Sequence, residues 1–561
     1  MAIPAEVAFA GWIPFAIALG LCVTLSGLYV HHLSHKRERD LLASVAGVLA
    51  LAASLLSSAL LPVDVFLVSF MKDAQGNFKA RLHLLANESE NFASLSCPSL
   101  RSEWAVNGTA RESIETTVLT AYYVLYGLLL VLGFLVLPFA YFFSEEKDDV
   151  LENSAGTRAC AAFKYTSIFL LVAAVLLTLG AVIPMHTTPP QNSTEWEKIE
   201  FLVHELSANR GEDALSFIVS LLTLVGMFVM IFYTGCGLAA LPVGLIAGSL
   251  STSQERSSVA DQLVSLDAQI NTLRNKLRGS MGSGRQSTDA ERLLALEEER
   301  RSLDERQRRL EHRQGTVAYR LRCLLRPVQI TVGCGSMLLG LLVWLSLLLV
   351  SIDKALHSLG YKMGYLLPKA SLPNPLDMAL VQSQKVFPID YVLYLAVVLY
   401  LVMCTVYGIR KMGIWFRTLP AQMYRIRPGR TRPQGILLLC LSLMFAVLAL
   451  NVLLYSVCPQ YTTFGSQHYL PQARPCGKCY LMPCTIDAPP ADCVMTRASA
   501  LLLRFFYKAW VFGACYFWAT VLLCASYVVA FVVVIARGRQ SAVEVNTDDL
   551  DGSDDEDLLR A

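Results

Sequence analysis

Cysteine is the residue type whose spacing could most directly support chemistry in this sequence, which has 15 cysteines among 561 residues. The string Cys476-Gly477-Lys478-Cys479 has the spacing of a redox motif or of half a zinc site. Because neither a strand-helix pattern nor a histidine cluster surrounds this pair, we interpret it as part of a set of structural disulfides, whose connectivity stays open. Six cysteines are candidates for that set, five of them within the segment 458–504: Cys97, Cys458, Cys476, Cys479, Cys484 and Cys493.

Metal ligands and proton carriers are sparse elsewhere in the sequence. His186 and His468 each lack a second ligand at a suitable spacing, so we expect solvated or structurally bonded imidazoles and no metal site. Asp64 and Asp390 lie at the ends of apolar runs, where an aspartate caps a helix more often than it relays protons. Asn451 lies deeper in such a run and is expected to form hydrogen bonds between helices.

Motifs for energy coupling and hydrolysis are absent from the sequence. It contains no Gly-x-x-x-x-Gly-Lys-Ser/Thr, no His-Glu-x-x-His and no Gly-x-Ser-x-Gly string. We therefore expect no enzyme, no catalytic residue and no covalently bound cofactor, and any uphill transport must use the ATPase of another protein. The net charge of +2 gives no indication of a nucleic-acid partner.

Apolar helices must position the residues described above. Apolar residues make up 54% of the chain and charged residues 16%, with a mean hydropathy of +0.47, a balance that requires lipid as part of the solvent. A helix that crosses the hydrocarbon core needs about 20 mostly apolar residues. Nine segments meet this need and predict an all-α, polytopic membrane protein: 8–30, 41–66, 117–143, 163–185, 213–245, 328–350, 386–410, 435–458 and 505–536.

Glycosylation motifs and basic residues predict the orientation of these spans. Three Asn-x-Ser/Thr acceptors, at Asn87, Asn107 and Asn192, fall in loops that alternate to the lumenal or exterior side. The short loop 409–434 carries the densest group of arginine and lysine residues between two spans, which assigns it to the cytosol. With nine spans, we expect a lumenal N-terminus and a cytosolic C-terminus.

Leucine spacing in the segment 246–327 predicts a cytosolic antiparallel helical hairpin. A Gly- and Ser-rich break at 279–288 separates two arms, and Leu296 and Leu303 continue a seven-residue repeat in the second arm. Because each arm is too short to be stable alone, the arms must pack on each other or on a second protomer, which leaves a homo-oligomer open. The apolar seam of the first arm is our candidate partner-docking surface, with a self-contained spacer as the alternative: Leu263, Leu266, Ile270, Leu273 and Leu277.

The pattern of spans and loops divides the chain into four parts. These are residues 1–245 with five spans and glycosylated lumenal loops, the hairpin 246–327, residues 328–536 with four spans and the Cys-rich lumenal loop 458–504, and the tail 537–561. Between the sixth and seventh spans, the proline-containing segment 351–386 is expected to cap the bundle as an interfacial or re-entrant element.

The C-terminal tail is acidic and predicts a disordered cytosolic segment. Asp554 stands four residues before the pair Leu558-Leu559, which is the form of a dileucine sorting signal read by clathrin adaptors. An accidental Leu-Leu pair in an acidic tail is the alternative, since the pattern is short.

Seven strings, in order and with compatible spacing, resemble the limb-region and lipocalin-interacting membrane receptor family. They are SALLPVDVFLVSFMK at 58–72, EEKDD at 145–149, NSTEWEK at 192–198, DKALHS at 353–358, GIRKMGIWF at 408–416, GRTRPQ at 429–434 and FGSQHYL at 464–470. The resemblance implies a lysosomal membrane protein, delivered by way of the endoplasmic reticulum, that is required for export of cobalamin (vitamin B12) to the cytosol. It also implies two partners: a subfamily-D ATP-binding-cassette half-transporter, which would be escorted and would supply the ATPase, and a cytosolic cobalamin-processing chaperone.

Two other functions stay open at this point. The chain could itself be a permease with cobalamin as its transported ligand, or it could be an endocytic receptor or adaptor at the plasma membrane. The resemblance implies that endocytosis would use a Tyr-x-x-apolar signal, whereas the comparable stretch here reads Ser253-Gln254-Glu255-Arg256-Ser257, without tyrosine. This departure counts against the endocytic role and leaves the escort role untouched.

Overall fold

The protein, in a computed structural model, forms two compact units that are described separately below. Unit 1 comprises Met1–Leu238 and Leu341–Val528, and unit 2 comprises Ala239–Gly340 and Val529–Ala561. The structure describes residues 13–34, 40–70, 108–146, 155–182, 210–247, 250–279, 292–294, 296–304, 317–367, 371–384, 386, 389–414, 426, 429, 431–469, 482–484, 493–508 and 510–537.

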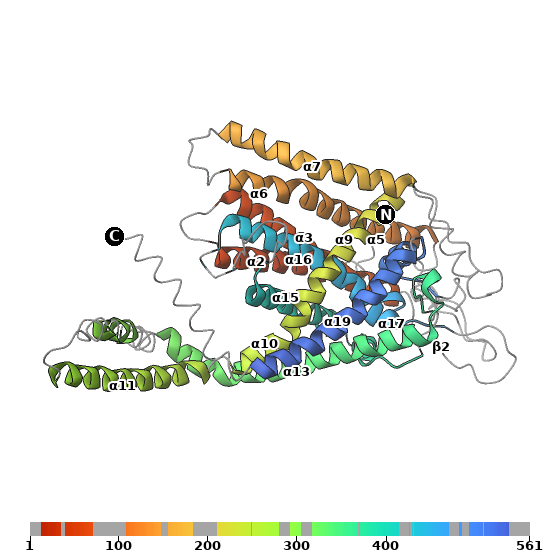
Figure 1. The fold of residues 1–561 in the computed structure, drawn as a ribbon. Helices are drawn as coiled ribbons and strands as arrows, with labels where there is room; N and C mark the ends of the chain where they lie inside the picture. The colour runs from red at the N-terminus through yellow and green to blue at the C-terminus, as the bar shows by residue number, and fades with distance from the viewer. Residues whose placement is uncertain are drawn as a thin grey trace. The chain divides into compact units, whose positions relative to one another are not determined.

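Nine helical stretches in the described residues are long and apolar enough to cross a membrane, which confirms the predicted polytopic, all-α fold (Figure 1). They are Phe15–Leu33, Leu41–Ser69, Glu115–Glu145, Gly156–Thr178, Ser216–Ile246, Pro327–His357, Ile389–Met412, Pro433–Val457 and Trp510–Ala536. The helices that supply them are α2 (Ile13–Leu33), α3 (Leu41–Phe70), α5 (Gly108–Val131), α6 (Leu137–Glu145), α7 (Ala155–Val182), α9 (Arg210–Val229), α10 (Gly235–Ala247), α13 (Val317–His357), α15 (Ile389–Met412), α16 (Pro433–Val457) and α19 (Trp510–Arg537).

The remaining elements connect the spans. They are the π-helical segments η2 (Leu132–Val136) and η3 (Met230–Thr234), helix α11 (Leu250–Gly279), the 3-10 turn η4 (Tyr361–Met363), helices α14 (Pro375–Ser383), α17 (Pro459–Thr463) and α18 (Arg497–Lys508), and strands β1 (His468–Tyr469) and β2 (Met482–Pro483). The two strands pair antiparallel, with His468 opposite Pro483 and Tyr469 opposite Met482.

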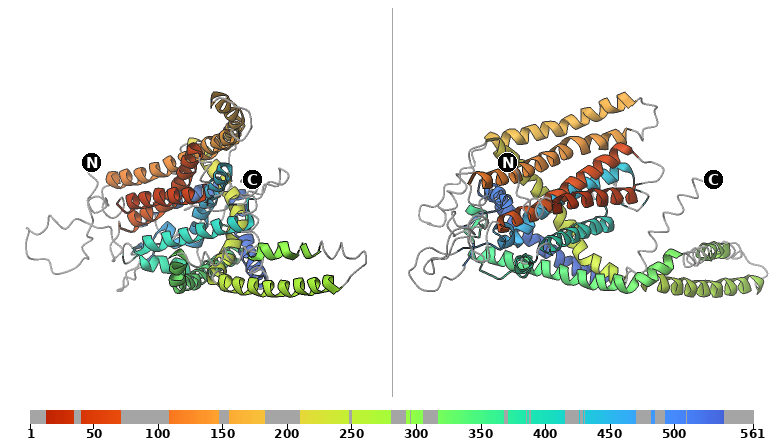
Figure 2. Two further views of the ribbon diagram at one scale, coloured as in Figure 1. Left: turned by 90° about the vertical axis from the view of Figure 1, so that its left-hand side faces the viewer. Right: turned by 180° about the vertical axis from the view of Figure 1, so that it is seen from behind.

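Helix α16 lies at the centre of the apolar core of unit 1. Pro433 begins the helix, a position where its missing N–H costs no hydrogen bond. The sequence of α16 is apolar on all sides, and 72% of its span is buried, mainly against α3 and α9. By contrast only 11% of the span in α7 is buried, and both Figure 1 and Figure 2 show α7 at the margin of unit 1. We infer that α7 faces lipid over most of its surface.

Polar side chains connect α16 to α3 inside the core. Ser58 Oγ donates to Asn451 Oδ1 at 2.5 Å, and Asn451 Nδ2 donates to Ser57 Oγ at 3.1 Å. The expected hydrogen bonds of Asn451 between helices are thereby confirmed. In a bilayer such bonds hold two helices in register, because the hydrophobic effect does not favour one apolar helix contact over lipid.

A glycine allows α9 to touch the backbone of α16. A Cβ atom added to Gly226 would lie 1.9 Å from the carbonyl oxygen of Phe445 and 2.9 Å from the Cβ of Ala449. No side chain fits in that space. This contact is of the small-residue type that lets helices in a membrane approach closely.

The contact between α15 and the chain from η3 to α10 uses a glycine on each side. A Cβ at Gly237 would lie 1.8 Å from the carbonyl oxygen of Cys404, and a Cβ at Gly408 would lie 2.0 Å from that of Tyr233. Gly237 lies beside Cys404, whereas the earlier residue Tyr233 lies beside the later residue Gly408, so the two helices run antiparallel. Each glycine therefore receives the backbone of the opposite helix.

The π-helical segment η3 takes part in the same contact. Thr234 Oγ1 lies 2.8 Å from Thr405 Oγ1, within hydrogen-bonding distance, and Tyr233 OH donates to the carbonyl oxygen of Gly413 at 3.2 Å. A π-helical turn holds one residue more than an α-helical turn of the same rise. A second such segment, η2, joins α5 to α6.

Substitution of Gly408 tests this packing. We expect Gly408→Ala to destabilise the protein by about 1–3 kcal/mol, because the added methyl group meets a carbonyl oxygen that belongs to a rigid helix. The matched control is Gly127→Ala, also in a membrane span, where nothing lies within 4 Å of the added Cβ. Thermal unfolding in detergent should show a lower Tm for the first variant alone, and equal Tm values would contradict the packing described here.

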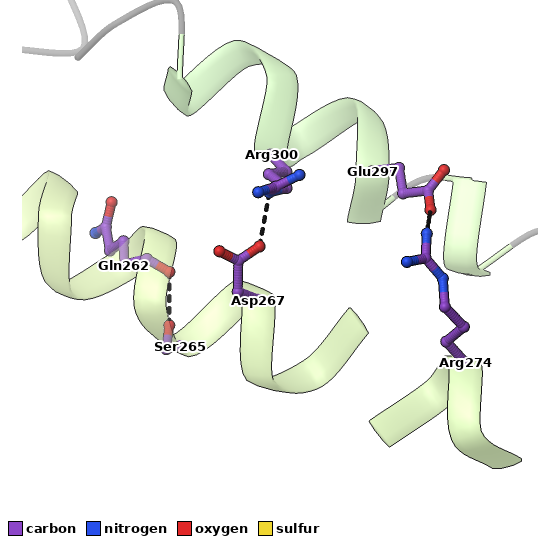
Figure 3. Close-up of polar contacts among 6 residues, drawn as sticks. All are labelled: Gln262, Ser265, Asp267, Arg274, Glu297 and Arg300. Atoms are coloured by element: carbon purple, nitrogen blue, oxygen red, sulfur yellow. Dashed lines mark hydrogen bonds and ion pairs between the residues drawn. The ribbon is translucent and has the colours of Figure 1, made fainter. Parts of the chain in front are cut away.

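Unit 2 contains the two arms of the predicted hairpin. The first arm is α11, which ends at Gly279 where the Gly- and Ser-rich segment begins, and the second arm is helical over residues 296–304. Figure 3 shows Arg300 directed at Asp267 and Glu297 directed at Arg274 across the gap between the arms, with ion pairs of 2.6 and 2.8 Å. The numbering rises in one arm and falls in the other, so the arms are antiparallel.

Two central residues of the predicted docking seam are buried, and the docking role of the seam stays a prediction. Leu266 and Ile270 are only 8% and 5% exposed, and Leu263 and Leu273 are half-buried. The side chain of the fifth candidate, Leu277, lies outside the described residues. Helices with a heptad-like seam commonly bury that seam against each other, so a partner would reach Leu266 and Ile270 only if the hairpin opened.

The seam, and not the ion pairs, should hold the hairpin together. Exposed ion pairs contribute about 0.2–1 kcal/mol each, whereas an unpaired charge buried in an apolar seam costs several kcal/mol. We expect Leu266→Lys to open the hairpin and to speed amide hydrogen exchange in α11 at least tenfold. Val264→Lys, at a position 71% exposed on the same helix, is the control and should leave exchange unchanged. Equal exchange in both variants would mean that the seam does not hold the arms.

Candidate functional site

A cavity of about 500 Å³ lies within unit 1 at one end of three membrane spans. We call it the α14 pocket. Its walls come from the last turns of α13 and α16, the first turns of α19, helices α14 and α17, and the turn that follows η4. The volume lies in the range of about 300–1,000 Å³ that is typical of small-molecule sites.

Local sequence explains why α14 begins where it does. Asn374 is the N-cap and accepts a hydrogen bond from the N–H of Leu376 at 3.2 Å, while Pro375 occupies the first helical position. The Asn374 amide also donates to the carbonyl oxygen of Val457 at the end of α16. This short helix is the capping element expected in segment 351–386. The start of α14 could have been predicted from the sequence Asn374-Pro375-Leu376-Asp377. In this sequence an N-cap residue is followed by a proline at the first helical position and by an acidic residue at the third.

Asp377 connects α14 to the start of α17. Its carboxylate accepts from the N–H of Gln460 at 3.2 Å and from the N–H of Tyr461 at 2.9 Å. These are N–H groups of the first helical turn, which have no partner within the helix. Burial raises the pKa of Asp377 to about 6, and the two backbone hydrogen bonds oppose that rise.

The end of α13 supplies an adjacent acid and base with different surroundings. Asp353 accepts from the N–H groups of Ser371 and Leu372 at 2.9 and 3.3 Å, and it pairs with His357 Nδ1 at 2.8 Å. Lys354 donates to Ser456 Oγ on α16. In the described part of the chain, no carboxylate forms an ion pair with this lysine. The sequence does not indicate this pair, because a single Asp-Lys dipeptide at a span end carries no specific signal.

An aromatic pair forms the wall of the pocket on the side of α19. The rings of Tyr365 and Phe517 stack with centroids 4.2 Å apart and planes at 21°. Tyr365 has φ +55°, a left-handed conformation that is costly for a residue with a side chain. The loop reaches this position because Gly513 lacks a side chain; a Cβ there would lie 2.8 Å from the carbonyl oxygen of Gly364. Strain of this kind is frequent at ligand sites.

The cysteine-rich segment beside α17 is closed by one disulfide bond among the described residues. Cys484 and Cys493 are joined, with a Cα–Cα distance of 5.9 Å, as two of the six predicted candidates. Gln467 holds the same turn, since its side chain donates to the carbonyl oxygen of Val494 at 2.8 Å and accepts from the N–H of that residue at 3.2 Å. His468 Nδ1 lies 2.7 Å from the carbonyl oxygen of Ser466, in line with the structural imidazole that we expected.

Cys458 departs from the predicted set of disulfides. It is a free thiol, 1% exposed, and it occupies the C-cap of α16. Burial in apolar surroundings raises the pKa of this thiol well above its ordinary value. The residue therefore belongs to the core of the bundle, and its place at the boundary of the loop made it look like a member of the lumenal group.

Both aspartates at span ends are buried, and Asp64 forms a structural hydrogen bond. Asp64 accepts from the N–H of Ala498 at 2.9 Å and so caps the start of α18, as the sequence interpretation predicted. Arg497, the first residue of α18, forms an ion pair with Glu115. Asp390 is 1% exposed in the first turn of α15. Within the described residues, no group of three or more His, Cys, Asp or Glu side chains could hold a metal ion.

Other predicted site residues lie outside the described residues, so they stay predictions. They are the glycosylation acceptors, three of the disulfide candidates, one histidine and the sorting signal: Asn87, Asn107, Asn192, Cys97, Cys476, Cys479, His186, Asp554, Leu558 and Leu559.

The fold and its irregular capping elements define a polytopic α-helical membrane protein with a cavity at one end of its spans. The family described as LMBR1-like membrane protein matches residues 11–306, and relatives match over nearly the full length, so the chain belongs to this family. No solved structure matches it.

Three relatives illustrate the similarity. A protein of Nematostella vectensis named "Probable lysosomal cobalamin transporter" is 39% identical over 99% of both chains. Proteins named "Lysosomal cobalamin transport escort protein LMBD1" are 37% identical in Gallus gallus, over 99% of both chains, and 38% identical in Bos taurus, over 98% of this chain and 97% of that one. These names describe transport and escort and none describes an enzyme.

The raised pKa of Asp377 leads to a prediction about stability. The folded protein holds this proton up to about pH 6, whereas an unfolded chain releases it near pH 4, so the contribution of Asp377 to stability falls as pH rises from 4 to 6. We expect the protein to lose about 1 kcal/mol from this group between pH 5 and pH 7.

Thermal unfolding at both pH values measures the effect. Asp377→Asn should reduce the difference in Tm between pH 5 and pH 7, while Asp261→Asn, at an exposed position in α11, should leave it unchanged. An unaltered pH difference in Asp377→Asn would refute the assignment.

Proposed function

We propose that this chain is a lysosomal membrane protein that acts as an escort in cobalamin export. In this proposal it accompanies a subfamily-D ATP-binding-cassette half-transporter from the endoplasmic reticulum to the lysosome. The observation that carries the proposal is similarity at 36–39% identity, over 97–99% of this chain, to relatives named for lysosomal cobalamin transport. The absence of a phosphate-binding loop fits a protein whose partner supplies the ATPase.

Close packing at two places between the spans of unit 1 favours an escort over a conduit. The cavity lined by Met230, Val343 and Leu453 has about 10 Å³, and the one lined by Tyr126, Val219 and Tyr516 has about 20 Å³. Such volumes hold about one water molecule. Because backbones also touch at Gly226 and Gly408, these helix contacts leave no room for a corrinoid ring.

Orientation and partner contacts follow from the same proposal. The N-terminus would be lumenal and the C-terminus cytosolic, with the hairpin of unit 2 exposed to the cytosol. There the outer face of the hairpin, with Val264 71% and Leu294 65% exposed, would be open to the half-transporter or to a cytosolic cobalamin-processing chaperone. A pool at the plasma membrane would depend on clathrin adaptors and the signal at Asp554, Leu558 and Leu559.

A permease is the second candidate function. It is favoured by the name of the Nematostella relative, which describes a transporter and not an escort. The two candidates differ in what the protein does alone: a permease moves cobalamin in liposomes that contain no other protein, whereas an escort does not.

Removal of the protein from cells that express it tests the escort proposal. We expect the half-transporter to leave lysosomes and remain in the endoplasmic reticulum, and radiolabelled cobalamin in isolated lysosomes to rise several-fold. Re-expression of the full chain should restore both quantities, whereas re-expression of Gly408→Ala should restore them less fully than Gly127→Ala. The half-transporter remaining in lysosomes with cobalamin unchanged would refute the proposal, and flux in liposomes with this protein alone would establish the permease.

A further inference from the structure

The α14 pocket has no part in the escort function proposed above, yet it has the features of a built site. Three spans meet at it near their ends: residues 349–354 in the last turns of α13, residues 455–456 in those of α16, and residues 513–517 in the first turns of α19. The cavity therefore lies at the boundary between the hydrocarbon core and the headgroup region of a bilayer.

Most of the pocket wall is apolar. Leu349 and Val350 line it from α13, Met378 and Val381 from α14, and the stacked pair of Tyr365 and Phe517 from the turn after η4 and from α19. Met378 is 54% exposed, so the pocket has an accessible side along α14. A wall of this composition accepts an apolar chain or ring.

One cation faces this apolar space. The ammonium group of Lys354 has three donors, and Ser456 Oγ takes one of them. Within the described residues neither carboxylate of the pocket forms an ion pair with it. Asp353 is occupied by His357 and two backbone N–H groups, and Asp377 is occupied by the start of α17. A charge in a partly apolar cavity is costly unless an opposite charge accompanies it.

The conformation of the wall agrees with a ligand site. Tyr365 is the one residue other than glycine with positive φ among the described residues, and it lies on the pocket. Backbone strain of this kind persists where surrounding contacts hold it, and it places the tyrosine ring flat on Phe517. The turn thus supplies an aromatic part of the pocket wall.

We propose that the α14 pocket binds a single-chain anionic amphiphile from the adjoining leaflet, with its carboxylate or phosphate at Lys354 and its acyl chain along the apolar wall. The cavity of about 500 Å³ favours one chain over a two-chain lipid. Oleate serves as the probe. Oleyl alcohol has the same chain without the charge, and acetate has the charge without the chain, so the three probes separate an amphiphile from a free anion.

Binding is measured on the purified full chain in detergent, by ligand-induced thermal stabilisation and by native mass spectrometry. We expect one oleate per chain, a rise in Tm with oleate, at least tenfold weaker binding of oleyl alcohol, and no shift with acetate. Acetate acting as strongly as oleate would overturn the proposal in favour of a site for free anions.

Two substitutions locate the site. Lys354→Met should weaken oleate at least tenfold, to the level of oleyl alcohol, while Lys362→Met, an exposed lysine in η4, leaves oleate binding unchanged. Val381→Trp should fill the cavity and abolish binding of both oleate and oleyl alcohol. Oleate binding that is equal in the wild type, Lys354→Met and Val381→Trp would overturn the proposal, whatever the outcome for escort.

Discussion

Direct contact between helix backbones is the constraint on which unit 1 depends. In a bilayer each span satisfies its own backbone hydrogen bonds, and lipid competes with every apolar contact, so helices associate where their surfaces fit most closely. Gly226, Gly237 and Gly408 provide such contacts by admitting a carbonyl oxygen of the opposite helix. Once α9, α10 and α15 are placed in this way around α16, the ends of the spans are placed as well. The connecting elements can then have irregular backbone.

Irregular backbone at a span end creates a need for hydrogen-bond acceptors, and buried carboxylates meet it. Asp64 serves the start of α18, Asp377 the start of α17, and Asp353 the segment that leads into α14. Each carboxylate accepts a hydrogen bond from backbone N–H groups that have no partner within a helix and that would otherwise bond to water. Polar groups therefore gather at this end of unit 1, and the α14 pocket lies among them, where short elements do not fill the volume that a full span would fill.

The spans and the hairpin were predictable from the sequence, because apolar length and leucine spacing are properties of contiguous residues. That Asp64 serves as a helix cap was expected from its place at the end of an apolar run, but the helix that it caps was not, because Ala498 is 434 residues away. The pocket was not predictable. Lys354 and Ser456 are 102 residues apart, and nothing local shows that they meet. Cys458 was assigned to the disulfide set because one residue decides whether a cysteine at a span end belongs to the core or to the loop. Heptad spacing identified Leu266 as a residue of the seam, but it did not predict whether the other arm or a partner protein would cover that residue.

The two π-helical segments have a consequence for how their spans are built. An α-helix turns by about 100° per residue, so one residue inserted within a single turn rotates everything that follows by about that angle. The part of the span after η3 therefore presents to its neighbours a side that an uninterrupted helix would have turned elsewhere. The same holds for α6 after η2. Each of these spans thus consists of two half-helices whose buried faces are rotated relative to each other. A single continuous apolar stripe along the span would not match both faces.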